Sequence, residues 1–405
     1  MKIAIVCNNL SLITGGPRLI FGLASGLEDL GNTVTIYAPD FNPAYYEEIS
    51  RGLAVKVVQP KSVPIPGPRT PGFLGWVGGK IREERYAIAL ARAIAEEIGK
   101  EADVVNVHDF SYRTAYFAKK LNPDVLTVWH ENAPIFAYIK RGKFLQDLAG
   151  FFYYRVFRAL ADRKYFHAMD KLVVLDRFNE ESAKRQGFKD ITMVRAGIDF
   201  QKFYAPVKDI KEKAARKHVE LLAVGALNAY RRYDNVIEAV KQLREWGYDA
   251  RARILANNIW HEDQCRDALI ALVKRYKLGP YVELNFEGVS EADIVRMFRE
   301  SDVFVQTVYS PPPSHHGWGL VNFEAMAAGV PVVLVGSATA TEVLKDGENA
   351  LFFEPMNALQ VAEKVKFLID NPDAYQRIAE AGQLYVKEHQ SWKRYAEETF
   401  RVFAP

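Results

Sequence analysis

Residues 316–333 are HGWGLVNFEAMAAGVPVV, a stretch that predicts a glycine-rich loop, a short helix and a strand in succession. Gly317 and Gly319 lack a Cβ atom, so the backbone can approach a ligand closely there. The apolar run after Gly319 predicts a helix that ends at Gly329, and residues 331–335 predict a buried strand. These are successive parts of an α/β domain.

The predicted loop and helix favour a ligand that carries both phosphate and hydroxyl groups. The loop would present free backbone N–H groups and the positive end of a helix to an anion, most naturally a phosphate. Glu324 is expected one turn inside the helix. A carboxylate repels phosphate, but it accepts hydrogen bonds from hydroxyl groups. Phosphate donors beside an acceptor of hydroxyls predict a site for a sugar nucleotide.

Both halves of the chain repeat the order strand, loop, helix, glycine and strand. The first half predicts the strand, loop glycines, helix and second strand at 2–7, 15–16, 17–30 and 33–37. The second half predicts the strand, loop, helix and second strand at 220–225, 226–232, 233–246 and 252–255. This order is a right-handed βαβ unit. Its recurrence predicts an α/β fold of two doubly wound Rossmann-like domains that face each other across a ligand cleft.

Composition and charge narrow the class of protein. The chain has 405 residues, 49% apolar and 25% charged, which is ordinary for a globular protein with two cores. A net charge of +3 is too small to indicate nucleic acid as a partner. Cys7 and Cys265 lie in different halves, which predicts no disulfide and a reducing compartment. The apolar run at 3–6 is too short for a signal-peptide core, so we expect a cytoplasmic protein.

The 316–333 stretch resembles the donor-site signature of retaining glycosyltransferases of the GT-B fold, glycosyltransferase family 4. That signature places two glutamates eight positions apart around a Gly-aromatic-Gly-Leu core. Glu324 matches the second glutamate, whereas His316 stands at the position of the first. The resemblance implies a hexosyltransferase that moves a sugar from a nucleoside-diphosphate sugar to an acceptor hydroxyl with retention. It also implies that the leaving phosphate assists removal of the acceptor proton and that neither metal nor cofactor is required.

Further landmarks of the family follow along the chain. Residues 195–199, Arg-Ala-Gly-Ile-Asp, resemble the family's Asn-Gly-(Val/Ile)-Asp turn with Ala196 in place of Asn. The turn predicts an N-terminal acceptor-side domain over 1–195 and a C-terminal donor domain over 196–385. Ser391 and Trp392 match a pair that precedes the family's last helix. By resemblance, the helix within 386–405 packs back on the first domain.

The donor diphosphate needs positive charge, and the sequence offers arginines for it. The sequence shows no close pair of carboxylates beside a strand end that would indicate a metal site. We therefore expect side-chain cations to neutralise the diphosphate instead. The segment 225–234 resembles the family's Gly-Arg-Leu…Lys-Gly motif, with Ala226 at the Arg position. Arg231 fits the Lys position by spacing, and Arg232 fits it if the loop is one residue longer. Both arginines precede a predicted helix, where cations are unfavourable unless an anion binds nearby.

Other residues of the second half are assigned to the donor by the same resemblance. The loop residues Gly317, Trp318, Gly319, Leu320 and Val321 are expected around the diphosphate, and Glu324 is expected at the ribose hydroxyls. His316 could contact the donor sugar, or it could face the diphosphate as a cation, and the sequence leaves both roles open. Glu342 matches a further family glutamate and is interpreted as a carboxylate at the start of a helix.

The first half supplies two histidines at the ends of predicted strands. The stretch 125–132 predicts a strand that ends in His130, which matches the family's cleft histidine near the reacting carbon. The stretch 103–109 predicts another strand, whose His108 matches a second, more variable position. Lone histidines are more often structural, so both assignments depend on the resemblance.

Four further residues of the first half are expected near the ligands. Gly15 and Gly16 match the family's paired glycines near the diphosphate and the acceptor. Asn9 and Arg18 are expected on the acceptor side.

The segment 138–167 is basic and aromatic. It has nine aromatic residues, and seven Lys or Arg against two Asp. Such a segment can lie on an anionic membrane surface, which fits a family that often uses lipid-linked acceptors. The alternative is a helix that packs its aromatic rings into the first domain and exposes its charges. We therefore expect a carbohydrate or lipid-linked acceptor and keep peripheral membrane contact open.

Two rival functions share the predicted fold. The departures at Ala226 and His316 would suit a non-catalytic protein that binds a nucleotide sugar. A sugar-nucleotide epimerase or a phosphorylase would use the same fold for different chemistry. Release of nucleotide without sugar transfer, or an isomerised donor, would favour the second rival.

Overall fold

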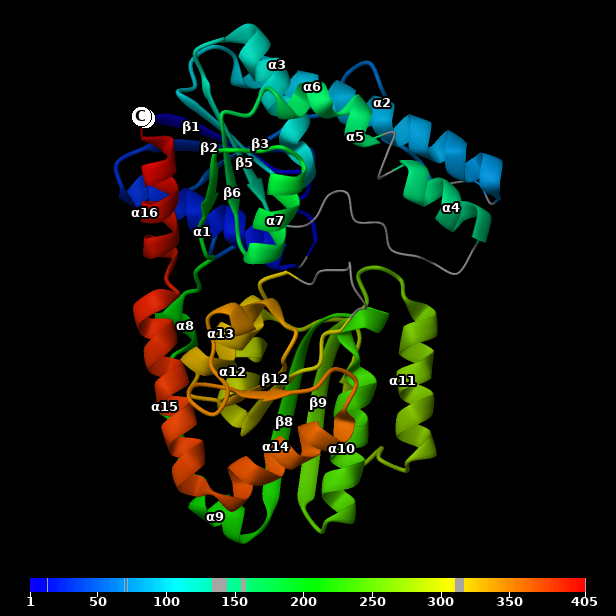
Figure 1. Ribbon diagram of the computed structural model, residues 1–405, viewed down its shortest axis with the longest axis vertical. Coiled ribbons are helices and arrows are strands. Elements are labelled where there is room, and N and C mark those ends of the chain that lie inside the picture. Colours follow the sequence, from blue (N-terminus) through cyan, green and yellow to red (C-terminus); the bar gives the residue numbers. More distant parts are fainter. Residues whose placement is uncertain are drawn as a thin grey trace. The chain divides into compact units, whose positions relative to one another are not determined.

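The computed structural model describes residues 1–12, 14–68, 70, 72–132, 144–153, 158–309 and 317–404. The chain forms two compact units. The first contains residues 1–195 together with the C-terminal residues from Tyr395 onward, and the second runs from Ala196 to Arg394 within the described ranges. Figure 1 shows both units along the chain, and each is described separately below.

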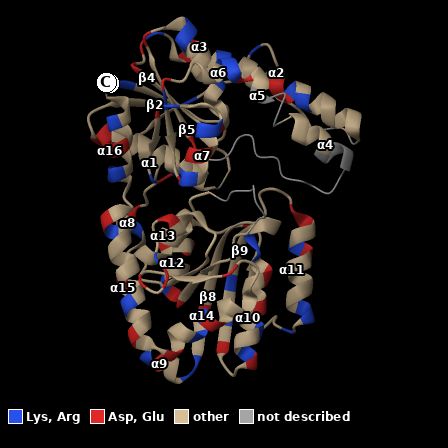
Figure 2. Cartoon of the chain, viewed as in Figure 1, with Lys and Arg blue, Asp and Glu red and all other residues tan. Residues whose placement is uncertain are grey.

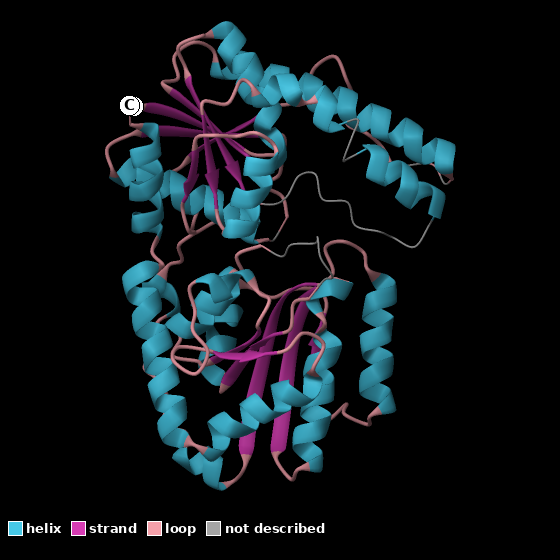
Figure 3. Ribbon diagram, viewed as in Figure 1, coloured by secondary structure: helices cyan, strands magenta, loops and turns pink. Residues whose placement is uncertain are grey.

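The first unit is built on a seven-stranded parallel sheet of order β3-β2-β1-β4-β5-β6-β7. Figure 3 draws the strands in magenta and the helices in cyan. Its strands are β1 (Lys2–Val6), β2 (Thr33–Ala38), β3 (Ala54–Val57), β4 (Val104–His108), β5 (Leu126–Glu131), β6 (Lys171–Val174) and β7 (Ile191–Met193). Its helices are α1 (Gly15–Asp29), α2 (Phe73–Ile98), α3 (Arg113–Leu121), α4 (Phe144–Phe152), α5 (Arg158–Ala161), α6 (Arg163–Phe166), α7 (Arg177–Arg185) and α16 (Trp392–Phe403), whose first residues fall in the second unit. The chain winds outward in both directions from β1 and β4.

The second unit repeats this plan with six parallel strands in the order β10-β9-β8-β11-β12-β13. Its strands are β8 (His218–Ala226), β9 (Asp249–Asn257), β10 (Val282–Asn285), β11 (Val303–Gln306), β12 (Val332–Val335) and β13 (Leu351–Phe353). Its helices are α8 (Phe200–Phe203), α9 (Lys211–Ala215), α10 (Tyr233–Glu245), α11 (Asp263–Arg275), α12 (Glu291–Glu300), α13 (Leu320–Ala327), α14 (Ala358–Asp370) and α15 (Pro372–His389). In this sheet the strand order runs outward in one direction from β8 and in the other direction from β11, so the order reverses between these two strands.

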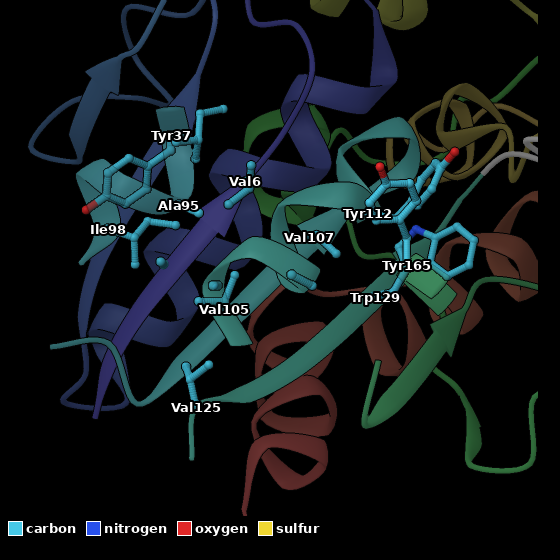
Figure 4. Close-up of a cluster of buried hydrophobic side chains, with 14 of the residues drawn as sticks. Val6, Tyr37, Ala95, Ile98, Val105, Val107, Tyr112, Val125, Trp129 and Tyr165 are labelled. Atoms are coloured by element: carbon cyan, nitrogen blue, oxygen red, sulfur yellow. The ribbon is translucent and has the colours of Figure 1, made fainter. Parts of the chain in front are cut away.

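The core of the first unit uses one face of β4 and β5. Val105, Val107 and Trp129 point into a buried cluster with Ala95 of α2 and Tyr112 (Figure 4). Because side chains alternate along a strand, their neighbours Asn106 and His130 point to the opposite face. These two residues are polar, and they form part of the candidate site.

The C-terminal helix α16 is tied to the first sheet. Lys171, at the start of β6, donates from Nζ to the carbonyl oxygens of Val402 at 2.8 Å and Ala404 at 3.1 Å. A cation at this end of a helix also opposes the negative end of its dipole. The predicted helix after Ser391 and Trp392 is confirmed, and it spans 12 residues.

The predicted fold class is confirmed, as are the strands and helices of both βαβ units. Two predictions were wrong in detail. The helix α1 begins at Gly15 rather than Pro17, so the paired glycines form its first turn and not a loop. Glu342 is the last residue of a 3-10 helix, Thr339–Glu342, rather than the start of a helix. Among the described helices, none is both long and apolar enough to cross a bilayer.

Candidate functional site

Each sheet has a point where its strand order reverses, and ligands of such folds bind at the carboxyl ends of the strands there. In the first unit these ends belong to β1 and β4, and in the second unit to β8 and β11. The candidate residues of the sequence follow these strands or their immediate neighbours. The topology therefore gives each unit one candidate region of its own.

In the second unit, the loop that enters α13 depends on Gly319. This residue has a φ of 72°, and a Cβ atom placed on it would lie 2.8 Å from Gln306 Nε2 and 2.9 Å from Asn322 Nδ2. Asn322 Nδ2 donates to Gln306 Oε1 at 3.1 Å, and its backbone N–H donates to the Gly319 carbonyl at 3.0 Å. Only glycine fits this tight arrangement. A Cβ atom placed on Gly317 would have no described atom within 4 Å, and Gly317 is exposed to solvent.

The side chains around this loop divide into packing and polar roles. Trp318 is only 3% exposed and stacks on Phe323 with ring centroids 5.3 Å apart, so its ring belongs mainly to the core. Leu320 is buried and Val321 is half-buried. Glu324 is 2% exposed on α13, which makes it a buried carboxylate beside the loop. His316 lies outside the described residues.

Arg231 closes the second loop of this unit, after β8. It ends a 3-10 helix, Ala229–Arg231, and its guanidinium carbon lies 5.6 Å from the centre of the Tyr230 ring. Its Nε is buried and has no hydrogen-bond partner in the described part of the chain. A Cβ atom on Gly225 would lie 3.0 Å from the Arg231 guanidinium carbon, so glycine at the end of β8 makes room for this cation.

Arg232 has a different environment. It lies in the left-handed region with a φ of 51° and precedes α10. Its Nε donates to Asp234 Oδ1 at 3.0 Å, and its terminal nitrogen pairs with the same carboxylate. Asp234 on the first turn of α10 is therefore an anionic partner of Arg232 within the chain itself.

The end of β11 joins the two loops. Gln306, its last residue, contacts Asn322 beside Gly319. The next residue, Thr307, donates from Oγ1 to the Arg231 carbonyl at 2.7 Å. The second unit thus brings Arg231 and the Gly319 loop together around one strand end, as the switch-point rule requires.

The candidate histidines of the first unit form a stacked pair. His108 and His130 are directly paired in the register of β4 and β5, and their rings stack at 4.5 Å with an angle of 6°. Burial lowers the pKa of His108 to about 3. Burial, together with the neighbouring His108, lowers the pKa of His130 well below its usual value. Both rings are therefore neutral at physiological pH.

Asn106 contacts both rings. Its Nδ2 lies 2.7 Å from His130 Nδ1, and its Oδ1 lies 2.9 Å from His108 Nε2. Asn132 Nδ2 approaches the other nitrogen of His108 at 3.4 Å. His130 Nε2 is buried and has no hydrogen-bond partner among the described residues. A neutral imidazole whose free nitrogen lies near a strand end can bind a polar atom of a ligand.

The remaining acceptor-side candidates lie near the end of β1. Asn9 donates to Asp40 Oδ2 at 3.0 Å and accepts from the backbone N–H groups of Ser11 and Leu12 at 3.0 Å each, so its amide shapes the loop. Gly15 and Gly16 are exposed in the first turn of α1. Arg18 is half-buried one turn later.

Several polar residues of these regions were not singled out from the sequence, chiefly Asn106, Gln306 and Asn322. Strands of a parallel sheet that are covered on both faces are expected to be continuously apolar. Asn106 interrupts the apolar run of β4, and Gln306 ends that of β11. That interruption is a signal that could have indicated both residues. Within the described ranges, no group of three or more His, Cys, Asp or Glu could hold a metal ion.

Known families match both halves of the chain. Residues 13–202 match the family described as Glycosyltransferase Family 4. Residues 207–385 match the family described as Glycosyl transferases group 1. The two matches meet near the boundary between the two compact units.

Individual proteins are similar over the whole chain or half of it. Human alpha-1,3/1,6-mannosyltransferase ALG2 is 24% identical, and the alignment covers 96% of this chain and 92% of that protein. Mannosylfructose-phosphate synthase of Agrobacterium fabrum is 25% identical over 52% of this chain, which corresponds to 46% of that enzyme.

Solved structures share the fold at low sequence identity. Sucrose-phosphate synthase from Thermosynechococcus elongatus superposes with a TM-score of 0.76 at 16% identity, covering 100% of this chain and 98% of that one. Anabaena Alr3699/HepE in complex with UDP superposes with a TM-score of 0.73 at 14% identity, covering 99% of both chains.

Proposed function

The chain is a glycosyltransferase of the GT-B fold, made of a Glycosyltransferase Family 4 domain and a Glycosyl transferases group 1 domain, and we propose that it transfers a hexose from a nucleoside-diphosphate sugar to an acceptor hydroxyl. The proposed acceptor is a carbohydrate or a lipid-linked carbohydrate. The names of its relatives, a mannosyltransferase and a mannosylfructose-phosphate synthase, support a hexose as the transferred group.

The observation that carries this proposal is the environment of Arg231. Its guanidinium lies at the end of β8 with a buried Nε that lacks a partner in the described chain, and β11 links its loop to the Gly319 loop. A diphosphate can accept hydrogen bonds from a guanidinium and from N–H groups at a helix start at the same time. Arg231 and the loop would hold the diphosphate, and Glu324 would accept hydrogen bonds from the ribose hydroxyls.

The acceptor side of the proposal belongs to the first unit. His130 would contact the donor sugar, while His108, Gly15, Asn9 and Arg18 would line the acceptor approach. Gly16 would lie close to the diphosphate. His316, outside the described residues, remains a prediction as a sugar or diphosphate contact.

Sugar transfer itself is the test. Purified protein would be incubated with UDP-, GDP- and ADP-hexoses, and both nucleoside diphosphate and glycosylated product would be measured, with Arg231→Ala as the control of reduced activity. The proposal expects nucleotide release matched by product from one donor family. Nucleotide release without transfer, or an isomerised donor, would instead indicate one of the rival chemistries.

Retention and independence of metal belong to the same proposal. Cationic side chains can neutralise the departing diphosphate without a metal ion. NMR of the product should show the anomeric configuration of the donor, and saturating EDTA should leave the rate unchanged. An inverted product or a rate restored only by a divalent ion would contradict this part.

We also propose that the first unit contacts a membrane surface through α2 and α4. Apolar side chains on these helices are strongly exposed, with Leu74 at 83% and Phe152 at 55%, and Phe151 lies beside Phe152. Tyr153 anchors the end of α4 to α2, because its ring lies 6.2 Å from that of Trp76. The part of α4 that Figure 2 does not draw in grey contains no Lys, Arg, Asp or Glu. Residues 138–143 and 154–157 of the predicted segment lie outside the described residues, and Tyr165 packs in the core as the alternative interpretation expected.

Flotation with vesicles tests this contact. Wild-type protein should float with anionic vesicles at low salt, and Phe151→Asp combined with Phe152→Asp should abolish flotation. Trp260→Asp changes an equally exposed ring of the second unit and should leave flotation intact. Absence of flotation by the wild type at low salt would end the proposal.

A further inference from the structure

One carboxamide lies between the two buried histidines of the first unit. Asn106 shares a face of β4 with His108, and β5 carries His130 beside them. The Asn106 Nδ2 to His130 Nδ1 distance is 2.7 Å, and the Asn106 Oδ1 to His108 Nε2 distance is 2.9 Å. All three residues are at most 1% exposed, so water does not compete for these contacts.

A backbone carbonyl fixes which way the carboxamide points. Asn106 Nδ2 also donates to the Val128 carbonyl oxygen at 3.1 Å. If the amide were rotated by half a turn, its oxygen would face this carbonyl and two acceptors would oppose each other. The NH₂ group therefore faces both Val128 and His130, and the amide oxygen faces His108.

This orientation determines where each histidine carries its proton. An NH₂ group can only donate, so His130 Nδ1 must accept and the proton of the neutral ring lies on Nε2. An amide oxygen can only accept, so His108 also carries its proton on Nε2. We propose that Asn106 is a positioning residue that holds His130 as a neutral Nε2–H donor toward an oxygen of the bound substrate. This inference rests on the proposed function, in which His130 contacts the donor sugar.

The unused nitrogen of His130 supports the inference. Its Nε2 is buried and lacks a hydrogen-bond partner in the described residues, and a buried donor without an acceptor is unfavourable. A sugar or phosphate oxygen would supply that acceptor. Among the described residues, the titratable groups whose rings contact His130 are His108 from β4 and Tyr395 from α16, whose ring meets it edge-on at 6.2 Å. The depressed pKa of His130 agrees with a ring that stays neutral.

The tautomer can be observed without any activity. Protein labelled with ¹⁵N-histidine would be studied by long-range ¹H–¹⁵N correlation, with His108→Ala and His130→Ala to assign the two rings. Both rings should show the Nε2–H pattern and remain unchanged between about pH 5.5 and 8. An Nδ1–H pattern at His130, a mixture of tautomers, or a titration in this range would overturn the proposal even if the enzyme is active.

Substitution of Asn106 separates positioning from packing. Asn106→Asp keeps an oxygen toward His108 but replaces the donor toward His130 by an oxygen, so His130 must protonate Nδ1. We expect the NMR pattern of His130 to change and kcat/KM to fall by about tenfold or more. In a His130→Ala background the same substitution should cause no further loss, because Asn106 acts through that ring.

Matched controls keep the result interpretable. Asn122→Asp makes the same chemical change at a half-buried residue after α3, and it should alter neither the histidine spectrum nor kcat/KM. Equal losses in the wild-type and His130→Ala backgrounds would show a merely structural role for Asn106 and overturn the proposal. If Asn106→Asp does not fold, the wild-type spectrum still decides the tautomer. If transfer is never detected but the spectrum is as expected, the proposed function fails and the positioning of His130 stands.

Discussion

At the scale of single residues, two adjacent arginines that the sequence offers for the same diphosphate contact have different surroundings in the structure. Arg231 fits the expected phosphate position by spacing, and Arg232 fits it if the loop is one residue longer. In the structure, Asp234 neutralises Arg232, whereas Arg231 has a buried Nε without a partner in the described chain. A cation that is already paired gains little from a second anion, so we propose Arg231 rather than Arg232 for the diphosphate contact.

This difference predicts unequal effects of two similar substitutions. Arg231→Ala should weaken donor binding by about ten- to hundredfold, because a hydrogen bond to a charged group contributes about 1.5–3 kcal/mol. Arg232→Ala removes a partly exposed ion pair and should cost at most about 1 kcal/mol of stability, with little effect on the donor. Calorimetric titration with the cognate nucleotide measures both, and equal losses of affinity would contradict the assignment.

At the scale of elements, the loop into α13 depends on backbone geometry as much as on side chains. Gly319 combines a positive φ with two close amide neighbours, and the nearby Gly317 has neither constraint. The two positions therefore favour glycine for different physical reasons. Gly317 leaves the backbone exposed, and Gly319 leaves room for the contact between Gln306 and Asn322.

The glycine pair supplies a matched test of the loop. Gly319→Ala should destabilise the second unit by about 1–3 kcal/mol and weaken donor binding, because the new Cβ would force the loop away from β11. Gly317→Ala should change stability by no more than about 0.5 kcal/mol. Urea unfolding followed by tryptophan fluorescence would compare them, and a Gly319→Ala protein as stable as Gly317→Ala would refute this role.

At the scale of the whole molecule, the sequence predicts architecture better than it predicts polar contacts. Two βαβ repeats and the glycine stops were enough to predict both parallel sheets, because hydrophobic periodicity and helix ends are local signals. The contacts of Asn106 with two histidines, and of Asp234 with Arg232, depend on which side chains face one another after folding. The start of α1 was missed because glycine is a weak helix former, although nothing prevents it from occupying a first turn.

The buried histidines predict that the protein loses stability in mild acid. In the unfolded chain a histidine binds a proton below about pH 6.5, but in the folded protein the pKa of His108 is about 3 and that of His130 is also lowered. The unfolded state therefore binds more protons below about pH 6.5, and the free energy of unfolding falls as pH decreases toward 3. The loss should approach about 1.4 kcal/mol per pH unit for each histidine.

Urea unfolding at several pH values checks this dependence. His130→Gln should reduce the slope between about pH 6 and 5 by up to about 1.4 kcal/mol per pH unit, and the exposed His167→Gln serves as the control substitution. An unchanged slope in His130→Gln would show that this ring is protonated in the folded protein.

The central claim is that the second unit binds a nucleoside-diphosphate sugar through Arg231, the Gly319 loop and Glu324. Thermal unfolding with UDP, GDP, ADP and their hexose conjugates tests it most directly, on wild type, Arg231→Ala and Glu324→Ala. At about 100 times its dissociation constant, one nucleotide family should stabilise the wild type by about 2.7 kcal/mol, and at the same concentration the shift should fall to about 1.4 kcal/mol or less in both variants. No shift with any nucleotide, or a shift as large as that of the wild type in both variants, would contradict the assignment.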